Sequence, residues 1–182
     1  MSHAFVIAIV GAESTGKTWL AQALRGALAD GQTAVATVGE HLREFCDAHG
    51  RTPTAGEQAA IAAEQTRRIE AAARAHHVVV ADTTALMTAI YSELVFGDRG
   101  LYAHAVREHR RCDLTLLTAL DLPWQADGLQ RDGPHVREPV DALLRRTLTQ
   151  AGIGYAVVGG IGPARLDAAL AALGAARRLR VG

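Results

Sequence analysis

The sequence predicts an α/β fold built on a parallel β-sheet flanked by helices, and three observations support this. Short runs rich in Val, Ile and Leu alternate along the chain with longer segments of helical periodicity. A glycine loop joins the first of these runs to the first helical segment. A hydrophobic fraction of 49% with 21% charged residues is ordinary for a globular protein, and 182 residues favour one domain, residues 1–182.

Five runs have strand character, and strands buried on both faces of a parallel sheet have this composition. These strands are expected at 4–10, 33–38, 77–81, 113–118 and 155–158. Helices are expected between them at 17–29, 40–48, 55–75, 84–96, 100–110, 137–151 and 163–179. The alternation implies right-handed crossovers and a five-stranded parallel sheet.

Composition and charge restrict the partners of this chain. The 19 acidic and 19 basic residues give a formal charge of zero, so no general attraction to nucleic acid or to an anionic membrane is expected. No apolar run reaches the length of a membrane span, and the first residues lack the basic region of a signal peptide, which favours a cytoplasmic protein. Cys46 and Cys112 stand alone and form neither a disulfide framework nor a zinc motif. A small-molecule substrate is expected, and a homo-oligomer is compatible with the sequence.

The glycine loop is Gly11-Ala12-Glu13-Ser14-Thr15-Gly16-Lys17-Thr18, which has the spacing of a phosphate-binding P-loop. Its glycines allow tight turns, so that backbone N–H groups and the following helix N-terminus surround phosphate oxygens. Lys17 is expected to reach the β- and γ-phosphates, and the Thr18 hydroxyl to bind Mg²⁺. Lys17 is the only lysine in a chain that otherwise uses arginine. The residues expected to bind the nucleotide are Gly11, Glu13, Ser14, Thr15, Gly16, Lys17 and Thr18.

Further candidates follow the second and third strands, because ligands bind at the carboxyl ends of parallel strands. Glu40 and Arg43 lie three residues apart and share a helix face, so that the carboxylate could accept the proton of an attacking hydroxyl and the arginine could hold an oxygen of the substrate. Asp82 closes the third strand, where an acid organises Mg²⁺. The alternatives are a surface ion pair for Glu40 and Arg43, and a helix cap for Asp82. Tyr91 is a candidate pocket residue, with core or surface packing as its alternative.

The segment after the fourth strand, about 122–137, has the polar, glycine-rich composition of a lid over a nucleotide. Arg131 and Arg137 would stabilise charge on the transferring phosphoryl group. Asp127 would hold a substrate hydroxyl or an arginine, and Trp124 offers a flat apolar face. The alternative is a surface loop that Trp124 anchors.

These features together resemble the nicotinamide riboside (ribosylnicotinamide) kinases, including the kinase domain of NadR-type proteins. The resemblance rests on the P-loop sequence, on Glu40 to Phe45, on Asp82-Thr83, on Cys112-Asp113-Leu114-Thr115, and on Pro123-Trp124 followed by Asp127-Gly128-Leu129. It implies transfer of the γ-phosphoryl group of ATP, with Mg²⁺, to the 5′-hydroxyl of nicotinamide riboside.

The same resemblance implies roles for individual residues. Lys17 and Thr18 would handle phosphate and metal, and Asp82 would be a metal ligand or base. Glu40 and Asp127 would contact ribose or the reacting hydroxyl, while the lid would carry Arg131 and Arg137.

Two other functions stay open. The chain could be a P-loop kinase for another nucleoside or vitamin-like alcohol, or a regulatory ATP-binding ATPase. A GTPase is disfavoured, because Thr118-Ala119-Leu120-Asp121 lacks the lysine of a guanine site. An arginine-bearing lid favours a transferase, since water must be kept from the phosphoryl group.

Overall fold

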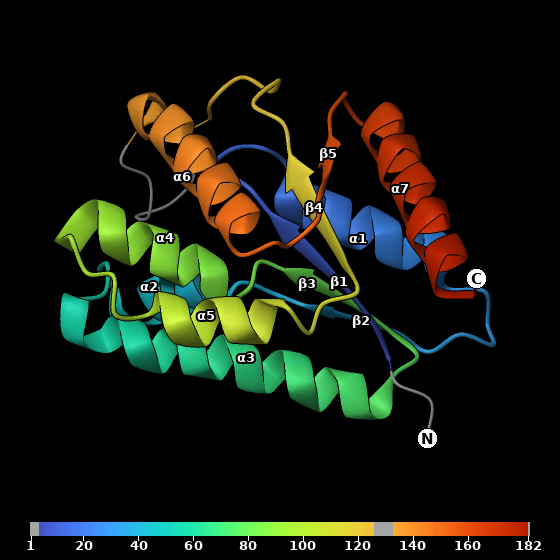
Figure 1. Cartoon of the computed structure of the whole chain (residues 1–182), viewed down its shortest axis with the longest axis horizontal. Helices are drawn as coiled ribbons and strands as arrows, with labels where there is room; N and C mark the ends of the chain where they lie inside the picture. Colours follow the sequence, from blue (N-terminus) through green and yellow to red (C-terminus); the bar gives the residue numbers. More distant parts are fainter. Residues whose placement is uncertain (1–3, 126–132, 182) are drawn as a thin grey trace.

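The computed structural model describes residues 4–125 and 133–181, which surround a five-stranded parallel sheet (Figure 1). The strand order is β2-β3-β1-β4-β5, and every neighbouring pair is parallel. The strands are β1 (Phe5–Val10), β2 (Val35–Val38), β3 (Val78–Asp82), β4 (Leu114–Thr118) and β5 (Ala156–Val158). The predicted sheet is therefore confirmed, with every strand boundary within two residues of its expected position.

Helices cover both faces of the sheet. In the described ranges they are α1 (Lys17–Leu28), α2 (His41–His49), α3 (Gln58–Ala75), α4 (Ala85–Phe96), α5 (Tyr102–His109), α6 (Arg137–Gln150) and α7 (Pro163–Val181). Helices α1 and α7 pack on one face, whereas α3, α4, α5 and α6 pack on the other (Figure 1). Helix α2 packs beside α3. This two-sided cover explains why the strands read as continuous apolar runs rather than as alternating ones.

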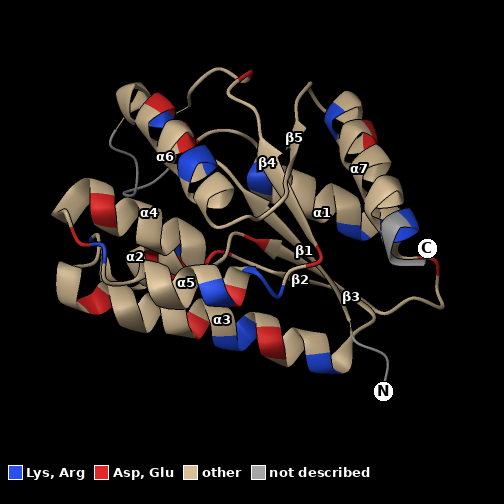
Figure 2. Ribbon diagram, in the orientation of Figure 1, with Lys and Arg blue, Asp and Glu red and all other residues tan. Residues whose placement is uncertain are grey.

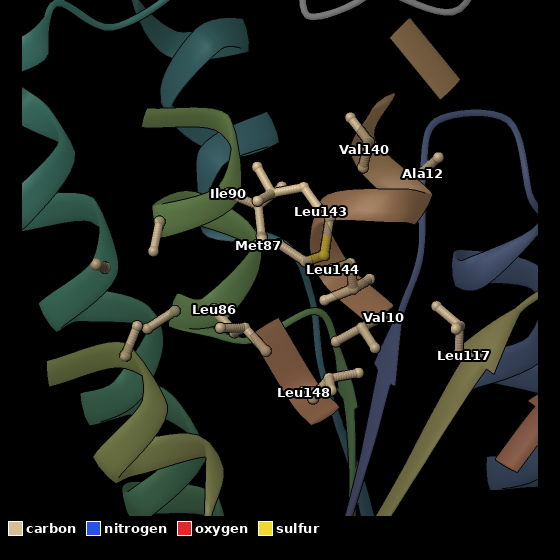
Figure 3. Packing of buried hydrophobic residues seen from close by; sticks show 14 residues of the cluster. Val10, Ala12, Leu86, Met87, Ile90, Leu117, Val140, Leu143, Leu144 and Leu148 are labelled. Carbon is tan, nitrogen blue, oxygen red and sulfur yellow. The ribbon is translucent and has the colours of Figure 1, made fainter. Parts of the chain in front are cut away.

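The central strand β1 shows this division residue by residue. Phe5, Ile7 and Ile9 belong to the core under α1 and α7, whereas Val6 and Val10 belong to clusters on the opposite face. Successive side chains of a strand point to opposite faces, so a strand covered on both sides needs apolar residues at every position. Figure 3 shows the larger cluster, in which α4 and α6 face each other over the sheet.

Only one predicted helix differs in kind from the prediction. The segment expected as a single helix at 55–75 begins with a 3₁₀ turn, η1 (Ala55–Glu57), before α3 starts. Thr54 and Glu57 form a capping box, in which the Thr54 backbone N–H donates to Glu57 Oε2 at 2.8 Å. This reciprocal contact satisfies the first orphan N–H groups and tightens the first turn. A second 3₁₀ turn, η2 (Pro134–Val136), precedes α6.

Charged residues lie mainly on the helices and loops (Figure 2). The strands are largely free of them, except near their ends, where Asp82 and Asp113 lie. Among the helices of the described ranges, none combines the length and the apolar character that a bilayer crossing requires.

His109 is a polar residue buried at the end of α5. It is 1% exposed, and its two ring nitrogens pair with the hydroxyls of Thr84 (2.8 Å) and Thr115 (2.9 Å). Burial lowers the pKa of His109 to about 4, because the charged imidazolium loses its hydration. The unfolded chain, with an ordinary histidine, therefore binds a proton at a higher pH than the folded one does.

We expect the free energy of unfolding to fall as the pH drops from about 6.5 towards 4, by about 1.4 kcal/mol per pH unit. The sign follows from the lowered pKa: stability is fully present above pH 6.5, where neither state is protonated at this site. Urea unfolding between pH 5 and 7 measures the slope. His109→Gln keeps a donor and an acceptor but does not titrate, so it should flatten the slope. An unchanged slope in that variant would contradict the assignment. The pKa of Glu64 is lowered from 4.5 to about 2 by Arg67 and Arg68, so its contribution to stability is lost only below about pH 4.5, under the measured range of pH 5 to 7.

Candidate functional site

The loop that joins β1 to α1 occupies the carboxyl edge of the sheet. Gly11 has φ +152°, and a Cβ atom built there would lie 2.0 Å from the Thr118 hydroxyl. Gly16 has φ +76° and caps α1 without a side-chain hydrogen bond, so the first N–H groups of the helix face the loop. Ser14 also has a positive φ, +53°. Both glycines are therefore required, one by close approach and one by backbone conformation.

A pair of threonine hydroxyls fixes the loop to the neighbouring strand. Thr15 Oγ1 donates to the Ala12 carbonyl at 2.8 Å and pairs with Thr118 Oγ1 at 2.7 Å. Thr118 Oγ1 also lies 3.3 Å from the Val10 carbonyl. On the other side, Ala12 is fully buried and packs towards Val140 of α6 (Figure 3). The loop is therefore fixed by hydrogen bonds to β4 and by the packing of Ala12 in the hydrophobic core. No sequence signal marks Thr118, because its role depends on which strand neighbours β1.

The expected metal ligands meet at the start of α1. Thr18 Oγ1 donates to Asp82 Oδ2 at 2.5 Å, and Asp82 is 4% exposed at the end of β3. The second carboxylate oxygen, Oδ1, is buried and has no hydrogen-bond partner among the described residues. Such an oxygen fits a hard cation or its water, since Mg²⁺ takes one or two protein oxygens and completes its shell with water and phosphate. The alternative role of Asp82 as a helix cap is wrong, because the Thr84 side chain accepts from the Leu86 N–H and caps α4.

A cavity of about 730 Å³ lies over the glycine loop. One wall consists of loop and helix residues, Ser14, Thr15, Gly16, Lys17, Thr18 and Trp19. The remaining lining residues are Leu122, Pro123 and Gln125 after β4, Ile161 after β5, and Arg43 of α2. The cavity therefore has a polar end made of backbone N–H groups and an apolar end made of the loops that follow β4 and β5.

A second, smaller cavity of about 50 Å³ adjoins the first, because Lys17 and Arg43 line both. Its other lining residues are Glu13, Glu40, Leu42, Met87 and Tyr91. The Arg43 guanidinium lies 3.8 Å from the Glu40 carboxylate, so the predicted shared helix face is confirmed. The structure thus brings Glu40, Arg43 and Tyr91 together beside Lys17. The Lys17 ammonium donates to the Ala12 carbonyl at 2.7 Å and lies where the two cavities meet.

The segment predicted as a lid is described at its two ends only. Ser14 Oγ donates to the Gln125 carbonyl at 2.8 Å, and the Gln125 N–H lies 3.2 Å from Ser14 Oγ, which ties this segment to the P-loop. Arg137 begins α6 and donates to the Leu122 carbonyl at 2.9 Å. Trp124 is half-buried, and neither Trp124 nor Arg137 belongs to the described residues that line the two cavities. Asp127 and Arg131 lie outside the described residues, so the arginine-bearing lid stays a prediction.

Several residues of the site were not predicted from the sequence. Trp19 is 45% exposed on the first turn of α1, and its place beside the P-loop was the available signal. Ile161 is 73% exposed within a glycine-rich turn that the sequence marks only as a chain reversal. Arg165 is buried below the loops, where its side chain donates to the Thr15 carbonyl. An apolar residue within a polar stretch of sequence can be recognised as part of a site only when the fold shows that its side chain is exposed.

Another cavity, of about 600 Å³, lies on the other side of the domain, between α3, α5 and the first residues of β1. Its lining is largely apolar and includes Val6, Ile69 and Cys112, where burial raises the pKa of the thiol to about 12. None of the predicted site residues lines it. The candidate functional site is therefore the pair of cavities at the P-loop.

The glycine loop, the parallel sheet and the Thr18–Asp82 pair at its carboxyl edge define a domain with the fold of the P-loop kinases. The family model described as an AAA domain matches residues 6–165, and the chain belongs to this family. No curated protein matches the sequence of the chain.

Three solved structures share the fold. The NadR protein in complex with NR has a TM-score of 0.73 and 18% identity, and the match covers 94% of this chain and 50% of that chain. The NadR protein in complex with NAD and AMP-PNP gives 0.69 and 19%, with the same coverage. Deoxyadenosine kinase from M.mycoides, with products dcmp and a flexible dcdp bound, gives 0.61 and 14%, covering 98% of this chain and 100% of that chain. This chain spans half the length of the NadR chains. The predicted resemblance to NadR is thereby confirmed at the level of the fold.

Proposed function

We propose that this chain is an ATP-dependent kinase that phosphorylates the 5′-hydroxyl of nicotinamide riboside, acting as one kinase domain in the cytoplasm. The observation that carries the proposal is the pair of adjoining cavities that share Lys17 and Arg43. One cavity suits a nucleoside triphosphate, and the other presents carboxyl groups to a second substrate. A two-substrate transfer needs this arrangement, in which the γ-phosphoryl group lies at the boundary.

The donor would place its phosphates on the glycine loop and its adenine between Leu122, Pro123 and Ile161 at the apolar end. Thr18 and Asp82 would hold Mg²⁺, which neutralises charge on the phosphates. During transfer, the 5′-oxygen bonds to the γ-phosphorus while the bond to the bridging oxygen of ADP breaks. Lys17 and Arg43, which line both cavities, would stabilise the charge on the equatorial oxygens of the transferring group.

The lining of the smaller cavity favours a cationic nucleoside as the acceptor. The carboxyl groups of Glu13 and Glu40 are balanced by Lys17 and Arg43 in the shared lining. Mg-ATP adds negative charge to that balance, so the occupied site favours a cation such as the pyridinium of nicotinamide riboside. Met87 and Tyr91 supply apolar and aromatic surface beside it. Glu40 is the candidate for the carboxylate that accepts the hydroxyl proton, with Asp82 and Asp127 as the other candidates.

The test is a panel of ribosides incubated with purified protein and Mg-ATP, read by the mass gain of one phosphoryl group and by ADP release. We expect nicotinamide riboside to react, and nicotinic acid riboside, which carries an additional carboxylate, to react roughly tenfold less efficiently. ADP formed without any acceptor would indicate an ATPase instead. Preference for an uncharged nucleoside would keep the kinase and overturn the choice of acceptor.

A further inference from the structure

Arg165 is a buried arginine whose partners lie in the loops at the carboxyl edge of the sheet and at the end of β5, where its Nη1 also donates to the Val158 carbonyl at 3.4 Å. It lies on the first turn of α7 and is 1% exposed. Its Nη1 donates to the Thr15 carbonyl of the P-loop at 2.8 Å, and its Nε donates to the Gly160 carbonyl at 2.9 Å. Its Nη2 pairs with the Asp121 carboxylate. One side chain therefore joins the loops that follow β1, β4 and β5.

The other Asp121 oxygen completes the connection. Asp121 Oδ2 accepts the Gly160 N–H at 2.6 Å, so that the aspartate bridges the loop after β4 to the loop after β5. The two glycines before Ile161 permit this approach. A Cβ atom at Gly159 would lie 2.9 Å from Asp121 Oδ2, and Gly160 has φ +91°. Glycines are therefore needed at these two positions to let the Asp121–Arg165 ion pair approach the backbone, as well as to reverse the chain.

The loops that Arg165 joins carry opposite ends of the donor cavity. Thr15 belongs to the phosphate end, whereas Asp121 precedes Leu122 and Pro123, and Gly160 precedes Ile161, at the apolar end. Arg165 is not among the residues that line the cavity. It can therefore act on a nucleotide only through the groups that it holds.

We propose that Arg165 is a positioning residue that fixes the nucleobase end of the donor cavity relative to its phosphate end. The proposal rests on the proposed function, because it takes a nucleoside triphosphate as the ligand. A planar guanidinium presents several donors in a fixed geometry, so it can hold three loops at once, which a lysine cannot do. The adenosine part of ATP then contributes its binding energy only when the nucleobase end and the phosphate end of the cavity keep their distance from each other.

The experiment compares Mg-ATP with Mg-triphosphate, which lacks the nucleoside, by titration calorimetry. The wild-type protein is expected to bind ATP more tightly than triphosphate. Arg165→Met should weaken ATP binding about tenfold or more and leave triphosphate binding within about threefold, because the P-loop keeps its threonine contacts. The affinity of Arg165→Lys for ATP should fall between those of the wild-type protein and Arg165→Met. Arg145→Met removes an arginine that pairs with Asp141 on α6 at 2.6 Å, outside the cavity, and should change neither affinity.

Asp121→Asn provides a second route if Arg165→Met lowers the melting temperature too far for titration. The Asp121 side chain is 37% exposed, so its replacement should leave the fold intact while it weakens the bridge. It should reproduce the selective loss of ATP affinity. Equal losses for both ligands, or no loss for ATP, would overturn the proposal. A wild-type protein that binds neither ligand would instead overturn the proposed function, and the two failures are therefore distinguishable.

Discussion

Replacing Lys17 with alanine is expected to lower the rate of phosphoryl transfer on the order of a hundredfold or more and to leave the fold intact. The ammonium lies at the boundary of the two cavities, where charge develops on the transferring group. The side chain is only partly buried and packs in none of the core clusters, so its loss removes little stability. Acceptor-dependent ADP formation measures the rate, and thermal unfolding checks the fold.

Two further variants sharpen this test. Lys17→Arg keeps the charge but should also be slow, because a planar guanidinium does not fit where a compact ammonium reaches between phosphates. Arg25→Ala removes an exposed basic residue from the last turn of the same helix and should keep the wild-type rate. Wild-type turnover in Lys17→Ala would exclude the assigned role.

Asp82→Asn is expected to lower turnover by about a hundredfold or more and to shift the Mg²⁺ dependence to higher concentration. The substitution keeps the shape of the side chain but removes the charge beside the Thr18 hydroxyl, which lies 2.5 Å away. A neutral amide is a weaker partner for a hard cation. A Mg²⁺ titration of the initial rate, at fixed ATP, measures both effects.

The structure removes a competing explanation for that result. Thr84 caps α4, so a slow Asp82→Asn enzyme cannot be attributed to a lost helix cap. Asp113→Asn is the matched control, since Asp113 precedes β4 at the opposite edge of the sheet and accepts the Val6 N–H at 2.7 Å. It should keep the rate and the Mg²⁺ dependence. If Asp82→Asn behaves like this control, Asp82 has no part in metal binding or proton transfer.

The sequence predicted the fold well because the evidence for it is local. The apolar runs and the helical periodicity place each element, and the glycine loop fixes the order of β1 and α1. The boundary of β2 was less accurate, because Asp30 Oδ1 accepts the N–H groups of Gln32 and Thr33 and holds Thr33 in a turn. Such side-chain contacts to the backbone compete with strand pairing and leave only a weak compositional signal.

The parts of the site that are contiguous in the sequence were predicted, whereas the parts formed by residues far apart in the sequence were not. The P-loop residues are contiguous, and Asp82 was found because it ends a strand next to β1. Arg165 and Asp121 lie 44 residues apart, and the contact of Arg165 with Thr15 spans 150 residues. These contacts depend on the order of the strands, which brings the loops after β1, β4 and β5 together. No spacing in the sequence encodes that order.

The presence of a single lysine at the boundary of the two cavities has a chemical consequence. Apart from the terminal amine, an acylating reagent finds no other amine in this sequence. The rate of acylation at Lys17 would therefore report how well a bound triphosphate shields the loop, without any engineered label. One acetyl group on this nitrogen would remove the only lysine charge in the sequence.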